Sequence, residues 1–296
     1  MKRSRTVAGP AKRPGITRVQ ALVDGKPSAS IPALDRGLAY GDGLFETIRF
    51  VAGAAPLWPL HMARLRAGCR RLQLPQPDLA LLAREAGCLA RGGDCIVKLV
   101  LTRGDGRGYG PDHAATTRRI LGRHDLPGMP ASVYGQGARL RWCRLQLSSQ
   151  PALAGLKHLN RLENVLARGE WRDPRIHEGL LLDADGHVIS ATAANVFIVR
   201  GGVLLTPKLD RCGVAGVARA WILRRARRAM AVREDDLDRA AALAADEVFI
   251  SNAVRGIVPV TRIGDRRFPV GPVTRRLGYT LAALGIGQPP GTLSER

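Results

Sequence analysis

The spacing of apolar residues along the chain predicts alternating strands and helices. Apolar side chains recur every three or four residues in Leu60–Leu74 and Leu79–Ala90, which is the spacing of one helix face. Cys95–Thr102 is a short, nearly continuous apolar run rich in valine, which favours a buried strand. Turn-forming pairs such as Asp24-Gly25 end strand-like segments, as expected for hairpins.

The remaining apolar segments extend this pattern along the whole chain. Further strands are predicted over Arg18–Val23, Leu44–Val51, Arg119–Leu121, Arg139–Leu145, Gly179–Leu182, Asn195–Val199, Val203–Leu205, Glu247–Ser251 and Ile257–Val260. Further helices are predicted over Arg161–Trp171, Gly213–Met230 and Val273–Leu284. Hairpins interspersed with helices predict the α+β fold class.

A turn-rich segment, Asp125–Pro130, divides the chain into two predicted domains. We expect a small N-terminal α+β domain over residues 17–125, an interdomain linker over residues 126–131 and a larger C-terminal domain over residues 132–288. Residues 1–16 are expected to form a disordered basic tail, and residues 289–296 a second tail.

The chain is strongly basic, with a formal net charge of +21 over 296 residues. The excess comes from arginines spread along the sequence, and aromatic residues make up only 4%. A nucleic-acid site should concentrate charge on one element and interleave aromatic residues for stacking. We therefore expect no nucleic-acid partner, although a non-catalytic basic protein that binds RNA or DNA stays as an alternative. The charge does favour anionic substrates.

Several features bear on the cellular location. No apolar run is long enough to span a membrane, and residues 1–15 lack the apolar core of a signal peptide. The first residues could also reflect a misassigned start. The five cysteines are scattered, odd in number and without a C-x-x-C pair, which argues against a disulfide framework or a structural zinc site. These features favour the cytoplasm, with no membrane partner and no bound metal.

One lysine stands out as a candidate catalytic amine. Such an amine must be held away from the solvent that normally surrounds lysines. Of the six lysines, Lys157 lies in a short segment, GLKHLN, between a strand region and the start of a helix. From this local pattern alone, Lys157 could equally be an ordinary lysine at a helix start.

The segment around this lysine resembles a known family. Leu156–Ala167, LKHLNRLENVLA, is similar to the cofactor-lysine segment of aminodeoxychorismate lyases, in the class IV, branched-chain-aminotransferase-like family of pyridoxal-phosphate enzymes. Companion motifs follow in the family's order: Asp35–Gly37, Tyr40–Thr47, His61–Leu65, Ala194–Phe197, Gly213–Gly216 and Ser251–Ala253. The resemblance covers roughly Val19 to Leu284.

The resemblance implies a two-domain, D-amino-acid-aminotransferase-like fold that depends on pyridoxal 5'-phosphate. Lys157 would carry the cofactor as a Schiff base, and the larger domain, residues 132–288, would bind it. Relatives are homodimers with the active site near the subunit boundary, so a homodimer is expected here.

A phosphate dianion needs fixed donors and a cation, and several motifs offer them. Gly213-Val214-Ala215-Gly216 opens a predicted helix, so the amides of Val214 and Ala215 would lie at its positive end. Arg64 can add a bidentate guanidinium contact. Asn252 and the amide of Ala253, after a predicted strand, would close the cradle. Taken singly, these residues could be an ordinary helix start and a surface arginine.

Four residues are candidates for binding the substrate. Arg107 and Tyr109 lie in a glycine-rich loop, RGDGRGY, whose string resembles the lyases more than the transaminases; there the arginine would hold a carboxylate and the phenol would hydrogen-bond to it. Glu46 and Asn160 are candidates for the surrounding polar network. The loop could also be a solvent loop, and Glu46 an outward-facing strand residue.

One position departs from the family pattern. Many relatives place a glutamate before the A/S-N-x-F strand, where it keeps the pyridine nitrogen protonated. The aligned residue is Ser190, whose hydroxyl can hydrogen-bond to that nitrogen without protonating it. A lyase whose product becomes aromatic tolerates a weaker electron sink better than a transaminase does. A carboxylate from elsewhere, such as Glu163, could take the glutamate's place.

The resemblance implies 4-amino-4-deoxychorismate lyase activity, giving 4-aminobenzoate and pyruvate for folate synthesis. The freed Lys157 amine would remove the ring C4 proton as a general base and could return a proton to the leaving group. A D-amino-acid or branched-chain transaminase on the same fold is the main alternative.

Overall fold

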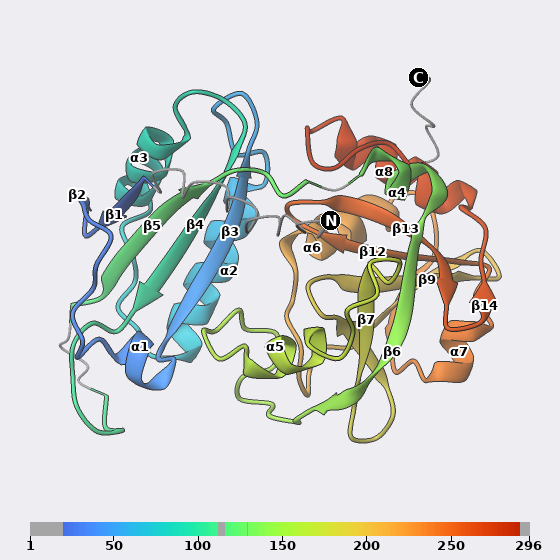
Figure 1. Ribbon diagram of the computed structural model, residues 1–296, viewed down its shortest axis with the longest axis horizontal. Coiled ribbons are helices and arrows are strands. Elements are labelled where there is room, and N and C mark those ends of the chain that lie inside the picture. Colours follow the sequence, from blue (N-terminus) through green and yellow to red (C-terminus); the bar gives the residue numbers. More distant parts are fainter. Residues whose placement is uncertain (1–19, 112–115, 129, 291–296) are drawn as a thin grey trace, which may run out of the picture.

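The computed structural model describes residues 20–111, 116–128 and 130–290. The predicted basic tail, residue 129 of the predicted linker and residues 291–296 lie outside these ranges. The described chain forms two mixed units of helix and sheet that lie side by side (Figure 1), each built on its own sheet. Within these ranges, no helix is long and apolar enough to cross a membrane.

The first unit is a five-stranded sheet with helices packed on one face. The strand order is β2-β1-β5-β4-β3, and the bounds are β1 Ala21–Val23, β2 Lys26–Pro27, β3 Gly43–Phe50, β4 Cys95–Thr102 and β5 Arg118–His124. The helices are α1 Arg36–Tyr40, α2 Trp58–Arg71 and α3 Leu79–Ala90. Helix α2 packs on β3, and α3 packs on β4 and β5, which encloses an apolar core.

The second unit is built on a nine-stranded sheet. The strand order is β11-β10-β9-β12-β13-β6-β7-β8, with β14 paired to β13. The strands are β6 Ala138–Leu147, β7 Glu178–Asp183, β8 Val188–Ala191, β9 Asn195–Arg200, β10 Val203–Pro207, β11 Val232–Asp235, β12 Glu247–Asn252, β13 Gly256–Ile263 and β14 Arg266–Arg267. The helices are α4 Ala131–Gln136, α5 Leu162–Arg168, α6 Val217–Ala226, α7 Arg239–Leu243 and α8 Pro272–Ala282.

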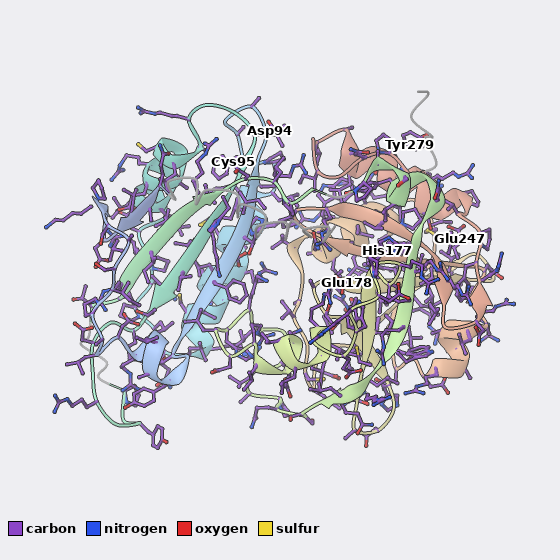
Figure 2. All side chains as sticks on the ribbon, viewed as in Figure 1. Asp94, Cys95, His177, Glu178, Glu247 and Tyr279 are labelled. Atoms are coloured by element: carbon purple, nitrogen blue, oxygen red, sulfur yellow. The ribbon has the colours of Figure 1, made fainter. Side chains whose placement is uncertain are left out.

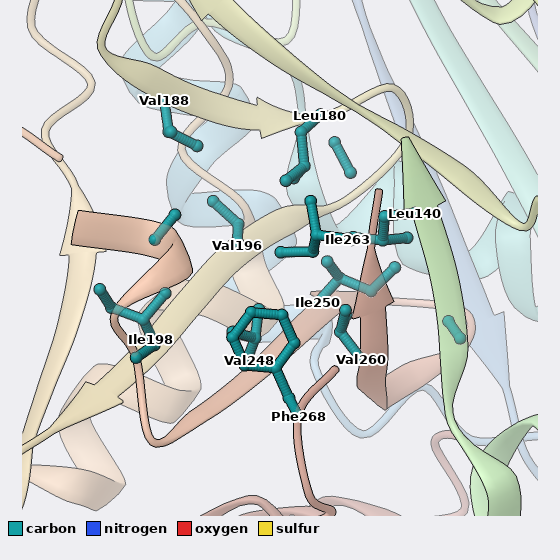
Figure 3. Packing of buried hydrophobic residues seen from close by; sticks show 14 of the residues in the cluster. Leu140, Leu180, Val188, Val196, Ile198, Val248, Ile250, Val260, Ile263 and Phe268 are labelled. Carbon is teal, nitrogen blue, oxygen red and sulfur yellow. The ribbon is translucent and has the colours of Figure 1, made fainter. Parts of the chain in front are cut away.

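The larger sheet encloses an apolar core on one side (Figure 3). Leu140, Leu180, Val196, Ile250 and Val260 come from five different strands and are all nearly inaccessible to solvent. Burying each such side chain contributes about 1.5–3 kcal/mol of hydrophobic free energy. Helices α6 and α8 pack against a further apolar cluster with β9 and β12. The sheet is therefore anchored on both sides.

Strand β3 alternates between buried and half-buried residues from Leu44 to Phe50, and this alternation places the site. Leu44, Glu46, Ile48 and Phe50 are buried, whereas the residues between them are only half-buried. Successive side chains of a strand point to opposite faces, so the buried set faces α2 and the core. The other set, which includes Phe45, is left to face the second unit.

Four of the five predicted helices are wrong at their ends, and Leu60–Leu74 and Val273–Leu284 are observed as Trp58–Arg71 and Pro272–Ala282. The other two differ for reasons that the structure shows. The helix predicted over Gly213–Met230 is only Val217–Ala226, because Gly213 has a φ of +83° and Val214 forms a parallel bridge with Gly155. The helix predicted over Arg161–Trp171 ends at Arg168, with Gly169 as its C-cap. In both cases the apolar spacing in the sequence extends beyond the helix into a turn, and contacts with other parts of the chain determine the conformation of that turn.

Hydrogen bonds join the two units directly. The amide of Phe45 on β3 donates to the carbonyl of Lys157 at 2.9 Å, and Arg49 Nη1 donates to the carbonyl of Val254 at 2.9 Å. Arg71 Nη1 donates to the carbonyl of Ala154 at 2.6 Å. The lysine segment thus lies at the junction, next to the edge of the first sheet.

Candidate active site

A pocket of about 670 Å³ opens between the two units. That size is within the range of roughly 300–1,000 Å³ typical of small-molecule sites. Its wall comprises Phe45 and Thr47 of β3, parts of the segment 157–164, the β8–β9 turn at 190–195, the loop before α6 and the turn at 252–255. Each part of the wall therefore comes from a different region of the sequence.

Lys157 lies in a short extended segment held between the two units. Its carbonyl accepts the amide of Phe45, and the amide of Leu159 donates to Gly43 at 3.1 Å. Two residues earlier, Gly155 has a φ of +78°, a conformation that favours glycine. The Lys157 ammonium nitrogen lies 4.1 Å from the centroid of the Phe45 ring. Its side chain lines the pocket, as the sequence predicted.

The pKa of Lys157 is lowered to about 8. Burial is the main cause, since it disfavours the charged form, and the positive charge of Arg64 adds to the effect. The carboxylate of Glu46 opposes the shift by raising the pKa. A substantial fraction of this amine is therefore neutral and nucleophilic near pH 8.

This shift predicts how the protein reacts with acetic anhydride. Acetylation of Lys157 should be half-maximal near pH 8 because only the neutral amine reacts. An ordinary lysine titrates near about 10.4. Mass spectrometry of the Lys157 peptide after brief labelling across a pH series measures the curve. The same peptide labelled in urea is the control, and coincidence of the native and denatured curves would refute the shift.

Glu46 does not line the pocket; it holds Arg64, which does. Arg64 Nε donates to Glu46 Oε1 at 2.8 Å, Arg64 Nη2 forms an ion pair with Glu46 Oε2, and His61 Nδ1 lies 2.6 Å from Oε2. Glu46 is 1% exposed, so the alternative of an outward-facing residue is wrong. The site gains a guanidinium group that is fixed in place.

The protonation states of this cluster follow from its contacts. Burial alone would raise the pKa of Glu46, but the charge of Arg64 and hydrogen bonds from His61 and Arg64 lower it to about 2. Burial lowers the pKa of His61. A carboxylate can only accept hydrogen bonds, so a neutral His61 must carry its proton on Nδ1. Glu46 is thus ionised and Arg64 is paired.

Backbone amides near Arg64 form a cradle of donors that suits an anion. The amide of Ala215 is already used, because it donates to Gly155 at 3.0 Å, and the Ala215 carbonyl accepts from Arg64 Nη1 at 3.0 Å. Among the described residues, the amides of Val214, Gly216 and Ala253 have no hydrogen-bond partner, and all three residues line the pocket. Unpaired amides beside a guanidinium group suit a phosphate.

Two asparagines hold the cradle in shape. Asn195 Nδ2 donates to the Val214 carbonyl at 2.9 Å, and a Cβ atom at Gly216 would collide with Asn195 Oδ1. The Asn252 side chain accepts the amides of Val254 and Arg255 at 3.0 and 2.7 Å. Asn252 therefore organises the turn with its side chain, while the free donor of that turn is the amide of Ala253.

Ser190 and Glu163 both line the pocket. Ser190 is 8% exposed on β8, and no described residue hydrogen-bonds to its hydroxyl. Glu163 Oε1 accepts the amide of Ser148 at 2.9 Å. Behind this part of the wall lies Glu178, at the start of β7 (Figure 2), which accepts a hydrogen bond from Thr192. Burial raises the pKa of Glu178.

The structure does not bring Arg107 and Tyr109 to the pocket of their own chain. Both are exposed, and the Tyr109 side chain is 88% accessible. Their loop is nevertheless anchored: Arg36 Nη1 donates to the Gly108 carbonyl at 2.6 Å, and the Gly108 amide donates to the Tyr40 hydroxyl at 2.9 Å. An anchored loop of this kind presents its side chains outward. Asn160, by contrast, does line the pocket.

Sequence analysis missed several residues of the wall. They are His158, Arg161, Asn164, Thr192 and Arg255. Three of them stand in the motif that contains Lys157, so that motif already carried the signal. Thr192 and Arg255 have no local signal, since their positions depend on how β8 and β12 are paired within the sheet.

Comparison with known proteins places this architecture in a family. The family model Amino-transferase class IV matches residues 43–263. The chain therefore belongs to the class IV aminotransferase family, and the predicted α+β fold class is confirmed. The crystal structure of 4-amino-4-deoxychorismate lyase from Pseudomonas aeruginosa superposes with a TM-score of 0.86 at 47% identity, covering 89% of this chain and 98% of that chain.

Curated relatives include both activities expected from the sequence. Aminodeoxychorismate lyase from Vibrio harveyi is 34% identical over 262 residues, covering 86% of this chain and 97% of the relative. A putative branched-chain-amino-acid aminotransferase from Methanocaldococcus jannaschii is 31% identical over 265 residues, covering 86% of this chain and 91% of the relative. The predicted resemblance to the lyases is confirmed.

Proposed function

We propose that this protein is a pyridoxal-phosphate-dependent 4-amino-4-deoxychorismate lyase, which releases pyruvate and forms 4-aminobenzoate for folate synthesis. The observation that carries the proposal is a half-buried lysine of lowered pKa beside an anion cradle, in a chain similar to two lyases. A branched-chain or D-amino-acid transaminase is the second candidate, and the relative from Methanocaldococcus jannaschii favours the branched-chain activity.

The residues of the pocket fit the cofactor. Lys157 would hold its aldehyde carbon covalently, and Arg64 with the amides of Val214, Gly216 and Ala253 would bind its phosphate. Ala215 takes part through its carbonyl, which positions Arg64, and Asn252 shapes the turn that presents Ala253. When bound, the cofactor supplies an electron sink for the substrate carbon that bears the amine.

Lys157 is the residue that moves protons. With the substrate held in the pocket, a neutral Lys157 amine would remove the proton from ring C4 of the substrate. Its lowered pKa makes a substantial fraction of the amine neutral near pH 8, and that fraction can act as a base. The same nitrogen can then return a proton to the enolpyruvyl leaving group. Loss of that group makes the ring aromatic, which draws the reaction forward.

Ser190 favours the lyase over the transaminase. Its hydroxyl is a neutral group on the pocket wall and can hydrogen-bond to the pyridine nitrogen without protonating it. A transaminase relies on a strong electron sink, whereas elimination to an aromatic product does not. Glu163 also lies on the wall, but its Oε1 is engaged by the Ser148 amide.

The substrate site is completed by a second copy of the chain in this proposal. Asn160 serves the pocket of its own subunit, whereas Arg107 and Tyr109 would reach the pocket of the partner subunit. Exposed apolar side chains support such a homodimer. On α5, Leu162 is 68% exposed and Val165 is 63% exposed, and on α1, Leu38 is 64% exposed. Sedimentation should give twice the 31.9 kDa chain mass, and a monomer at micromolar concentration would refute it.

The function is tested by product formation. Purified, cofactor-loaded protein is mixed with freshly generated 4-amino-4-deoxychorismate, and the fluorescence of 4-aminobenzoate is followed. Parallel reactions contain 2-oxoglutarate with branched-chain or D-amino acids. Release of 4-aminobenzoate and pyruvate in equal amounts supports the lyase. Glutamate formation without 4-aminobenzoate would refute it and establish the transaminase.

A further inference from the structure

The pocket wall carries three guanidinium groups, and two of them have a carboxylate partner. Arg64 is paired with Glu46, and Arg255 lies 3.4 Å from Glu178. Arg161 has no carboxylate within ion-pair distance among the residues that the structure describes. A partly buried cation without a counter-ion is costly unless an anion from elsewhere compensates it.

The single partner of Arg161 in the described chain is a neutral imidazole. Its Nη2 is hydrogen-bonded to His158 Nε2, and the pKa of His158 is lowered to about 4, by burial first and then by the charge of Arg161. A neutral ring that accepts on Nε2 carries its proton on Nδ1. His158 Nδ1 and Arg161 Nε are both buried without a partner in the described structure. The pair thus offers donors and lacks an acceptor.

Nearby charges do not neutralise Arg161. Burial lowers the pKa of Arg161, and Glu163, two residues later, opposes this shift without cancelling it. The Glu163 carboxylate accepts the Ser148 amide and is not within ion-pair distance of the guanidinium. Lys157 lies close enough for the charge of Arg161 to lower the pKa of Lys157. This end of the pocket therefore has an excess of positive charge.

Along the chain, Arg161 and the contact with the phosphate cradle lie on opposite sides of Lys157. The cradle is joined to the chain before Lys157, through the Ala215–Gly155 hydrogen bond. Beyond Lys157 the segment is extended along β3, where His158 bridges Leu44, and Asn160 packs against Gly41. Arg161 follows on that side. A cofactor phosphate in the cradle and an anion at Arg161 would therefore flank Lys157.

We propose that Arg161 binds a carboxylate of the substrate, with His158 holding the guanidinium in position. This inference rests on the proposed function, whose substrate carries two carboxylates. Arg161 would hold the substrate in the pocket beside Lys157 through this carboxylate. Removing the guanidinium should weaken substrate binding about 10- to 100-fold, because the charged hydrogen bond between Arg161 and the substrate carboxylate is then lost.

The test compares Arg161→Gln with Arg172→Gln, which removes an exposed arginine outside the pocket. Two ligands are used: 4-amino-4-deoxychorismate for KM and kcat, and chorismate, a dicarboxylate without the amine, for Kd by calorimetry. Arg161→Gln should raise KM and the chorismate Kd about 10- to 100-fold, with kcat changed much less. Arg172→Gln should match the native enzyme, and Arg161→Lys should recover part of the affinity.

Two further measurements distinguish a substrate contact at Arg161 from a phosphate contact and from a failure of the lyase assignment. Absorbance titration of the apoenzyme measures cofactor affinity, which should be the same in Arg161→Gln as in the native protein. A large loss of cofactor affinity would overturn the proposal, since it would mean that the guanidinium binds the cofactor phosphate. Chorismate binding needs no turnover. Weaker chorismate binding by Arg161→Gln thus supports a carboxylate contact at Arg161 even if the native enzyme makes no 4-aminobenzoate. Equal binding by native and Arg161→Gln, or none by either, overturns the inference.

Discussion

Replacing Lys157 with alanine is expected to abolish 4-aminobenzoate formation, lowering kcat by at least about 10⁴-fold. General acid–base catalysis by one positioned group is worth about 10²–10⁴-fold, and in the proposed function this lysine would also form the covalent link to the cofactor. The amine is held over the Phe45 ring at 4.1 Å, and no other lysine lines the pocket in the described structure. Rapid-quench product analysis with the reconstituted variant measures the loss.

A lysine that the site does not use provides the control. Lys26→Ala removes an exposed amine on β2, and its kcat should equal that of the native enzyme. Cofactor loading of Lys157→Ala is followed separately by absorbance, because the cradle can still hold the phosphate without a covalent bond. Product formation by Lys157→Ala at more than a tenth of the native rate would exclude this lysine as the catalytic base.

Replacing Glu46 with glutamine is expected to lower the free energy of unfolding of the apoenzyme by about 3 kcal/mol. Breaking a buried ion pair leaves an uncompensated charge, which costs about 3–5 kcal/mol. Here the charge left behind is that of Arg64, whose side chain is 13% exposed, and Glu46 itself is 1% exposed. Urea denaturation measures the change, and cofactor affinity should fall with it because Arg64 loses its fixed position.

A matched variant tests whether burial is the cause. Asp236 is also held by two cations, Lys208 and Arg211, but their side chains are 41% and 27% exposed and its own is 32% exposed. Asp236→Asn should cost less than about 1 kcal/mol, as exposed ion pairs do. Equal losses in the two variants would mean that the Glu46 pair behaves as a surface pair.

The contribution of Glu46 should also depend on pH. Its pKa falls from 4.5 to about 2 on folding, so its stabilising effect is complete above the unfolded value and is lost as the pH falls through the folded one. The stability difference between native protein and Glu46→Gln should therefore shrink between pH 4.5 and about pH 2. A difference that stays constant over this window would contradict an ionised Glu46.

The sequence by itself determined the features that depend on neighbouring residues. Apolar spacing predicted β4 and α3 with their observed bounds, since a helix or strand repeats over a few residues. The contiguous motifs around Lys157 and Gly213–Gly216 indicated the lysine and the anion site, because each is made largely of consecutive residues. Lys157, Arg64, Val214, Ala253 and Ser190 are indeed all found on one pocket.

Only the tertiary structure decided how those residues are partnered. Glu46 turns to α2 because β3 alternates, and so it serves Arg64 and not the pocket. The Ala215 amide is used by Gly155, which is distant along the chain, and this moves the free donors to Val214 and Gly216. Arg161 is without a carboxylate because no acidic residue folds against it in the described chain. Hydrogen bonds and ion pairs join residues far apart in sequence, and no local pattern specifies them.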